Sequence, residues 1–211
     1  MNSSTSNKGL MERLADGPVI CAEGYLFELE RRGYLQAGAF VPEAVLDHPD
    51  EVRQLHREFV HAGSDVVEAF TYYGHREKLR LIGKEHLLED LNREALRIAS
   101  EVAQESGTLL AGNICNTNLF EPDSAESEKQ VRAMFEEQVA WAVEANAELI
   151  IGETFSYTAE ALIALDVIKQ TKLPAVITMA FHRTDTTREG HTAGESCKRI
   201  ADGGADVAGL N

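Results

Sequence analysis

The sequence predicts an α/β fold in which helices alternate with the strands of a parallel sheet. Short apolar runs of four to eight residues recur along the chain, and longer amphipathic stretches separate them. Several runs follow a turn of small residues, such as Ser106-Gly107 or Gly203-Gly204-Ala205, that ends a helix and starts a strand. Because alternating strands and helices form right-handed βαβ units, the strands are expected to run parallel.

Six apolar runs are the expected strands. They are residues 18–23, 65–71, 108–114, 148–153, 174–179 and 206–211. Polar residues gather where these runs end, namely Glu23, Thr71, Asn113, Glu153, Thr178 and Asn211. In a βα barrel the active site lies at this rim, so these side chains are functional candidates. The alternative is that strand ends are polar only because they enter loops.

The amphipathic stretches are the expected helices. Pro49 suits the first position of a helix, and an apolar stripe follows it at Val52, Leu55, Phe59 and Val60. Two longer helices are expected at 85–105 and 127–145, where apolar residues recur every three or four positions.

Polar residues mark several expected helix starts. The acidic run 121–128 (EPDSAESE) either caps the helix that follows or forms a lid at the barrel mouth. Thr158 is expected to cap the next helix, and Thr192 with Glu195 forms a capping box for the last one.

This pattern is compatible with an open doubly wound sheet or with an eight-stranded βα barrel, which typically needs ~250 residues. No G-x-G-x-x-G follows any strand, so neither a dinucleotide site nor an unrelated α/β protein acting on phosphorylated substrates is favoured. The chain ends in Gly209-Leu210-Asn211, at the end of a strand whose edge would be unpaired. We therefore expect it to be part of a longer protein.

Composition and charge exclude several classes of function. The chain has 211 residues, of which 20 are basic and 35 acidic, and its net charge of −15 disfavours nucleic acid or an anionic membrane as a partner. No apolar run reaches the ~18 residues of a membrane span, and the first residues lack the apolar core of a secretory signal. The three cysteines are far apart, which indicates a reducing compartment and predicts a cytoplasmic protein. Whether the chain forms a homo-oligomer stays open.

A series of segments shares its order and spacing with one enzyme family. The segments are 23–34 (EGYLFELERRGY), 38–44 (GAFVPEA), 48–63 (HPDEVRQLHREFVHAG), 69–79 (AFTYYGHREKL), Ala111-Gly112, 150–155 (IIGETF), Thr178-Met179 and Gly194-Glu195. Over roughly residues 10–211 the chain thereby resembles the homocysteine S-methyltransferases, and most of all their betaine-dependent branch. The resemblance implies a TIM-type (β/α)8 barrel with about six of its eight βα units in this chain. It also implies that residues 1–211 are one incomplete homocysteine-binding barrel domain, with residues 1–10 flexible.

The resemblance also implies an activity, which is transfer of a methyl group from betaine or a related onium donor to homocysteine, giving methionine. In the family, Zn²⁺ held by three cysteine thiolates binds the homocysteine sulfur. The first of these cysteines follows the strand motif that corresponds to Gly209-Leu210-Asn211, and the other two come much later. Cys21, Cys115 and Cys197 match none of them, so no metal ligand is expected in this chain. The alternative is a catalytically inactive relative that binds a small amine or amino acid.

The same resemblance assigns substrate-binding residues. Glu153 matches the glutamate that contacts the homocysteine amino group. Where the branch has an aspartate followed by two glycines, this chain has Ala22, Glu23 and Gly24, so Glu23 is a candidate for the missing carboxylate.

Only some of the aromatic residues that form the methyl-donor site of the betaine-dependent branch are present in this chain. Phe40 stands at a tryptophan position, Tyr73 matches a tyrosine near the donor, and Thr154 replaces a second tyrosine. The expected substrate-binding set is Glu153, Glu23, Gly24, Phe40, Thr71, Tyr73 and Asn211, and no catalytic residue is assigned.

Overall fold

The computed structural model describes residues 8–36, 42–181 and 185–211 of the chain. Within them, five strands form one parallel sheet in the order of the sequence. The strands are β1 (Val66–Glu68), β2 (Leu109–Cys115), β3 (Leu149–Phe155), β4 (Ala175–Met179) and β5 (Val207–Leu210). A doubly wound sheet reverses its strand order, whereas this sheet adds each strand beside the preceding one. The winding is that of a βα barrel, which confirms the expected fold class.

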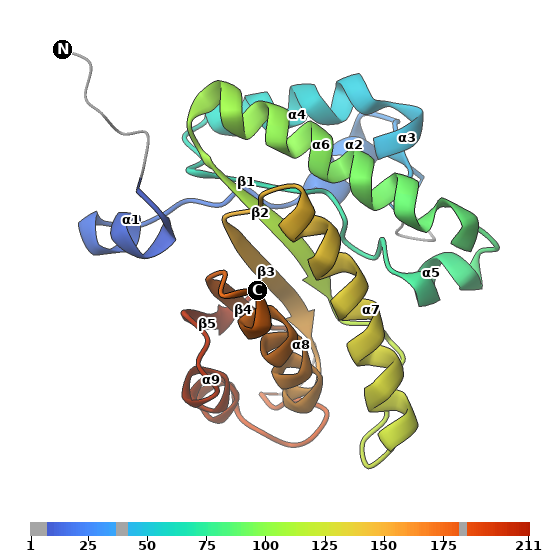
Figure 1. Cartoon of the computed structure of the whole chain (residues 1–211), viewed down its shortest axis with the longest axis vertical. Helices are drawn as coiled ribbons and strands as arrows, with labels where there is room; N and C mark the ends of the chain where they lie inside the picture. The colour runs from blue at the N-terminus through green and yellow to red at the C-terminus, as the bar shows by residue number, and fades with distance from the viewer. Residues whose placement is uncertain (1–7, 37–41, 182–184) are drawn as a thin grey trace.

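Helices pack against this sheet, most of them on one face. They are α1 (Leu10–Asp16), α2 (Tyr25–Arg31), α3 (Ala44–Asp47), α4 (Pro49–His61), α5 (Arg76–Leu81), the 3₁₀ turn η1 (Glu85–Leu87), α6 (Leu88–Ser106), α7 (Ala125–Glu144), α8 (Thr158–Thr171) and α9 (Ala193–Asp202). From α4 through α6, α7 and α8 to α9, each helix packs on the next, and this row curves around the strands (Figure 1). None of the described helices combines the length and the hydropathy that a bilayer span requires.

Alternate strand residues enter two different parts of the core. Val67, Leu110 and Ile150 pack outward with residues of the helices. Val66 and Leu109 pack on the opposite face, where Leu10 of α1 joins them. This period of two is expected of strands that are buried on both faces. Of residues 1–10, which were expected to be flexible, residues 1–7 lie outside the described part of the chain, and Leu10 is buried.

The first expected strand, 18–23, is wrong as a strand. Only Cys21 forms a bridge, parallel to Val66 at the β1 edge. Side chains take the donors that a longer ladder would use: Ile20 N–H donates to the Asp65 carboxylate and Ala22 N–H to Ser64 Oγ. Pro18 has no N–H to contribute. The segment therefore holds the sixth position of the sheet through one bridge.

The other five strands and the long helices follow the expected pattern with shifted ends. Pro49 is the first residue of α4, and the Thr192–Glu195 capping box starts α9. The run 121–128 leads into α7, whose N-cap is Ser124. The expected cap at Thr158 is wrong, because Tyr157 is the N-cap of α8. The backbone N–H groups of the first turn of α8 are instead bound by the carboxylate of Glu189.

Four short helices, α1, α2, α3 and α5, were not expected. They are only four to seven residues long. An amphipathic period of 3.6 residues needs two or more turns to be recognised, so these segments carry no usable pattern.

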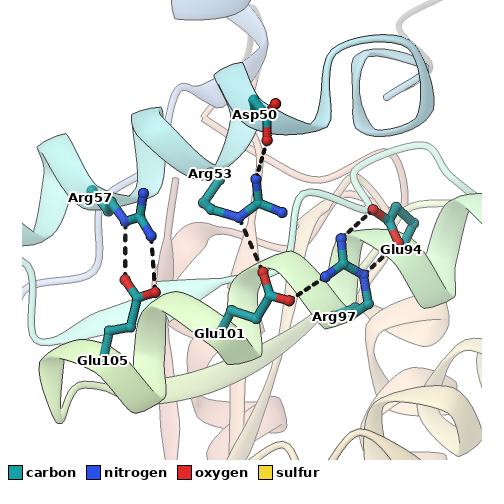
Figure 2. Close-up of polar contacts among 7 residues, drawn as sticks. All are labelled: Asp50, Arg53, Arg57, Glu94, Arg97, Glu101 and Glu105. Carbon is teal, nitrogen blue, oxygen red and sulfur yellow. Dashed lines mark hydrogen bonds and ion pairs between the residues drawn. The ribbon is translucent and has the colours of Figure 1, made fainter.

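A ladder of ion pairs joins α4 to α6 (Figure 2). Arg53 of α4 donates to Glu101 of α6 across 3.1 Å and also pairs with Asp50 of its own helix. One turn further along α4, two nitrogens of Arg57 donate to the carboxylate of Glu105, at 2.9 and 3.0 Å. The remaining members are Glu94 and Arg97, which extend the ladder along α6. The ladder thus joins two helices that both pack on β1.

We expect Arg53→Gln to lower the free energy of unfolding by roughly 1 kcal/mol or less, because ion pairs near the surface contribute little in water. The loss should be larger at low salt than in 1 M NaCl, since screening weakens the pairs that the substitution removes. Urea denaturation at both salt concentrations measures this. Lys198→Gln, which removes one exposed pair within α9, is the control and should have a smaller effect. An equal loss at both salt concentrations would contradict the electrostatic account.

Candidate functional site

A pocket of about 630 Å³ opens at the carboxyl ends of the strands. Glu68 ends β1, Asn113 lies near the end of β2, and Glu153 lies near the end of β3. Asn211, directly after β5, completes this edge of the pocket, and Glu23 and the start of α2 close the other side. The pocket therefore occupies the rim at which βα barrels carry their active sites.

One amide joins two acidic groups inside this pocket. Asn113 Nδ2 donates to Glu68 Oε1 and to Glu153 Oε1, each at 2.6 Å. Only 3% of Glu68 and 5% of Asn113 is exposed. The three side chains come from adjacent strands and project to the same face of the sheet, because the strands are parallel and in register.

Burial raises the pKa values of these carboxyl groups. Desolvation, with the nearby charge of Glu23, raises the pKa of Glu153 to about 7, although the Asn113 amide opposes the shift. Desolvation and the charge of Glu153 raise the pKa of Glu68 well above its ordinary value. Burial also raises the pKa of Glu23. Three carboxyl groups thus share one partly dehydrated space, where a bound cation would be stabilised.

The backbone is strained where β3 ends. Thr154 has a φ of 62°, a left-handed conformation that β-branched residues rarely adopt, and the pairing of β3 with β4 is shifted beside it. Asn211 holds this bulge in place: its Oδ1 accepts from Thr154 N–H at 3.2 Å, and its Nδ2 donates to Thr154 Oγ1 at 2.8 Å. Strain of this kind is concentrated at functional sites, and here it lies directly beside Glu153.

Aromatic rings form another part of the pocket wall. Tyr72 and Tyr73 lie with their ring centroids 4.4 Å apart, and Lys78 Nζ is 4.6 Å from the Tyr73 centroid. The Tyr73 backbone N–H donates to Cys115 Sγ at 3.2 Å. Phe27 and Leu81 line the same pocket with largely exposed side chains. The pocket can therefore contact both a charged group and apolar groups of a ligand.

The structure brings together most of the residues expected from the sequence. Five of the expected residues line the pocket: Glu23, Gly24, Tyr73, Glu153 and Asn211. Thr71 is buried and is not among the lining residues, and its hydroxyl donates to the Asn113 carbonyl at 2.8 Å. Phe40 lies outside the described residues.

Glu68 and Lys78 were missed as site residues, and Asn113 was noted only as a polar strand end. Glu68 carried a detectable signal, because it is the single charge inside the apolar run that follows Asp65. A charge inside a buried apolar run costs free energy unless it is paired with another group or binds a ligand. Nothing in the local pattern distinguishes Lys78 from other surface lysines.

The described cysteines do not form a zinc site. No three His, Cys, Asp or Glu side chains within residues 8–36, 42–181 and 185–211 are grouped as metal ligands. Cys115 is buried behind Tyr73, Cys197 is in α9, and Cys21 is next to Glu68, whose charge adds to burial in raising the pKa of this thiol. A zinc ligand must be a thiolate, so this environment disfavours metal binding at Cys21.

We expect the chain of residues 1–211 to bind no stoichiometric zinc. Its three thiols come from distant parts of the fold, whereas a tetrahedral site needs sulfurs about 2.3 Å from one metal ion. Metal analysis after dialysis against trace zinc measures this. One tightly held zinc per chain would contradict this expectation and show that residues 1–211 supply a metal site of their own.

Two sequence comparisons point to the same family of enzymes. A family model described as homocysteine S-methyltransferase matches residues 20–211. The chain is 37% identical over 216 residues to betaine–homocysteine S-methyltransferase 1 of Xenopus tropicalis, covering 100% of this chain and 53% of that protein. It is 35% identical over 207 residues to S-methylmethionine–homocysteine S-methyltransferase BHMT2 of Pongo abelii, covering 98% and 55%. The chain thus spans about half the length of these curated relatives.

A solved structure supports the fold. The metallated form of the homocysteine methyltransferase MmuM from Escherichia coli superposes with a TM-score of 0.78, over 95% of this chain and 77% of that one. Because the sequence identity is 18%, this likeness speaks for the barrel architecture alone.

Proposed function

This chain belongs to the homocysteine S-methyltransferase family, and from that premise we propose that its pocket binds homocysteine beside an onium methyl donor. The activity proposed for the protein is transfer of the donor's methyl group to the homocysteine sulfur, giving methionine. The observation that carries the proposal is the placement of Glu153 at the end of a barrel strand, inside an acidic pocket with an aromatic wall.

Glu153 is proposed to bind the substrate's amino group. The ammonium of homocysteine is positively charged at neutral pH, and a carboxylate pairs with it through charge-assisted hydrogen bonds. Asn113, Thr154 and Asn211 all contact the Glu153 carboxyl group and hold it toward the pocket. Binding of the ammonium would also offset the desolvation that raises the pKa of Glu153.

The aromatic wall is proposed to receive the donor. A methylated ammonium or sulfonium is stabilised over the faces of electron-rich rings, which Tyr72 and Tyr73 supply. In the reaction, the thiolate sulfur attacks the methyl carbon. A carbon–sulfur bond forms as the bond between the methyl group and the onium atom breaks, and that atom keeps the electron pair. The protein's part is to hold the two substrates in line.

Zinc would keep the homocysteine sulfur as a thiolate, if the protein uses this metal as the family resemblance implies. The described residues do not fit such a site, so the roles proposed for them are binding and orientation.

A catalytically inactive relative is the second candidate. It is favoured by Ala22, which has no side-chain acceptor and whose N–H is bonded to Ser64 Oγ at 3.1 Å. If Glu23 does not replace the missing carboxylate, the pocket has one fewer charged partner for the ligand.

The experiment supplies the intact protein with homocysteine and a donor carrying a deuterated methyl group, either betaine or S-methylmethionine. Mass spectrometry should find methionine with the label from at least one donor. Homocysteine binding without labelled methionine would favour the inactive relative. If homocysteine does not bind at all, the proposed function is wrong.

A further inference from the structure

One buried acceptor in the pocket has no donor. Both protons of Asn113 Nδ2 are directed to carboxyl groups, one to Glu68 and one to Glu153. Asn113 Oδ1 is buried, and no donor among the described residues meets it. An unpaired buried acceptor costs free energy, so the pocket is expected to receive a donor from beyond the described residues.

The surroundings of Asn113 specify what that donor is. Glu68, Glu153 and Glu23 line the same cavity, where burial disfavours their ionised forms unless a positive charge lies among them. A neutral donor would satisfy Asn113 Oδ1 but would leave the carboxylates without a counter-charge. A primary ammonium has a positive charge and three N–H donors, so it can both donate to Asn113 Oδ1 and neutralise the carboxylates.

We propose that Glu68 and Asn113 are specificity-determining residues, which with Glu153 form a three-acceptor cradle for a primary ammonium group. The cradle consists of the Glu68 carboxyl group, the Glu153 carboxyl group and Asn113 Oδ1. The inference rests on the proposed function, in which that ammonium belongs to homocysteine.

The cradle also distinguishes homocysteine from the methyl donor. Each methyl group on a nitrogen removes one N–H donor, and a quaternary ammonium has none, so it cannot satisfy Asn113 Oδ1. A quaternary or sulfonium donor gains nothing from the cradle and is favoured over the rings of Tyr72 and Tyr73 instead. The pocket thereby assigns the unmethylated amine to the strand ends and the methylated centre to the aromatic wall.

Calorimetry on the intact protein tests the cradle with three thiols. These are homocysteine, N-methylhomocysteine and 4-mercaptobutanoate, which has no amine. Wild-type protein should bind homocysteine roughly tenfold or more tightly than either analogue, because each analogue leaves buried acceptors unpaired. Glu68→Gln should weaken homocysteine binding by about tenfold and leave the affinity for 4-mercaptobutanoate unchanged or improved.

The ratio of the affinities for homocysteine and 4-mercaptobutanoate is the decisive readout, since a general disturbance of the pocket would weaken both and a loss of folded protein would lower only the number of binding sites. Glu148→Gln is the matched control: Glu148 is an exposed carboxylate at the opposite end of β3, where it accepts from Leu110 N–H. It should leave the ratio unchanged.

The outcomes separate the two proposals. An unchanged ratio in Glu68→Gln, or equal binding of homocysteine and N-methylhomocysteine by the wild type, would overturn the cradle. The proposed function would survive that result if wild-type protein still binds homocysteine and Glu153→Gln weakens it. Absence of homocysteine binding to the wild type would overturn both. The comparison with N-methylhomocysteine needs no variant, so the test holds even if Glu68→Gln does not fold.

Discussion

Glu153→Gln is expected to weaken homocysteine binding by about ten- to a hundredfold, the usual effect of losing one charged partner of a hydrogen bond. The substitution keeps the shape of the side chain and removes its charge. The amide oxygen that it introduces can still accept from Asn113 Nδ2, so the fold should be retained. Titration calorimetry at pH 8 measures the affinity. Unchanged affinity would remove the main residue-level support for a homocysteine site.

The affinity of the protein for homocysteine should change with pH in a defined direction. With a pKa of about 7, Glu153 is increasingly ionised between pH 6 and pH 8, so homocysteine binding by the wild type should strengthen over this range. Glu153→Gln should lose that part of the dependence. The substrate thiol also titrates near this range, but it does so equally with both proteins and cancels in the comparison.

The stability of the wild-type protein should depend on pH in the opposite sense to its binding of homocysteine. The pKa of Glu153 is raised from 4.5 on folding, so the stability linked to its proton is fully present below pH 4.5 and is lost as the pH rises through about 7. Glu153→Gln removes a buried charge at high pH, and its thermal midpoint relative to the wild type should therefore be higher at pH 8 than at pH 5. Such a variant would be more stable and bind less well, as is common where a site contains buried charge.

Glu23→Gln separates two roles for the neighbouring carboxylate. It should weaken homocysteine binding as Glu153→Gln does only if Glu23 has taken over the role vacated at Ala22. If the affinity at pH 8 is unchanged, Glu23 does not hold the substrate's ammonium, and the substitution should only lower the pKa of Glu153 by removing a neighbouring charge.

The sequence predicted the sheet well because buried parallel strands are continuous apolar runs. Such runs are still recognised when the predicted ends of a strand are wrong by a few residues. The same small errors decided which site residues were found. The second expected run reached Thr71, but β1 ends at Glu68. The residue at the rim is therefore Glu68, and Thr71 lies behind the pocket wall, where it supports Asn113.

The arrangement at the end of β3 could not be read from local pattern. The bulge beside Thr154 depends on a partner 57 residues away, since Asn211 bonds both its N–H and its hydroxyl. The bridge by which Asn113 joins two carboxyl groups likewise depends on three strands lying in register. Such contacts follow from the tertiary fold, whereas the family resemblance pointed to Glu153 and Tyr73 residue by residue.

Gly112→Ala is expected to be the most destabilising of these substitutions, although it adds only one methyl group. A Cβ at this position of β2 would be 2.6 Å from the Cβ of Ala142 in α7 and 2.8 Å from Ile150 Cδ1 in β3. Ile150 can change its rotamer, but the Ala142 Cβ is fixed to the helix backbone, so α7 must move away from the sheet. Overpacking of this kind typically costs about 1–3 kcal/mol, which lowers the thermal midpoint of a domain of this size by roughly 2–10 °C.

Gly194→Ala is the matched control for this effect, because it makes the same chemical change near the start of α9, where no atom lies within 4 Å of an added Cβ. Alanine is the better helix former there, so this variant should be as stable as the wild type or more stable. Equal midpoints for Gly112→Ala and the wild type would show that α7 and β2 are less tightly packed than the structure describes. The expected result would explain the Ala111-Gly112 pair of the sequence resemblance by close approach of a helix to the barrel wall, and would place its role in the scaffold that holds Asn113 rather than in contact with substrate.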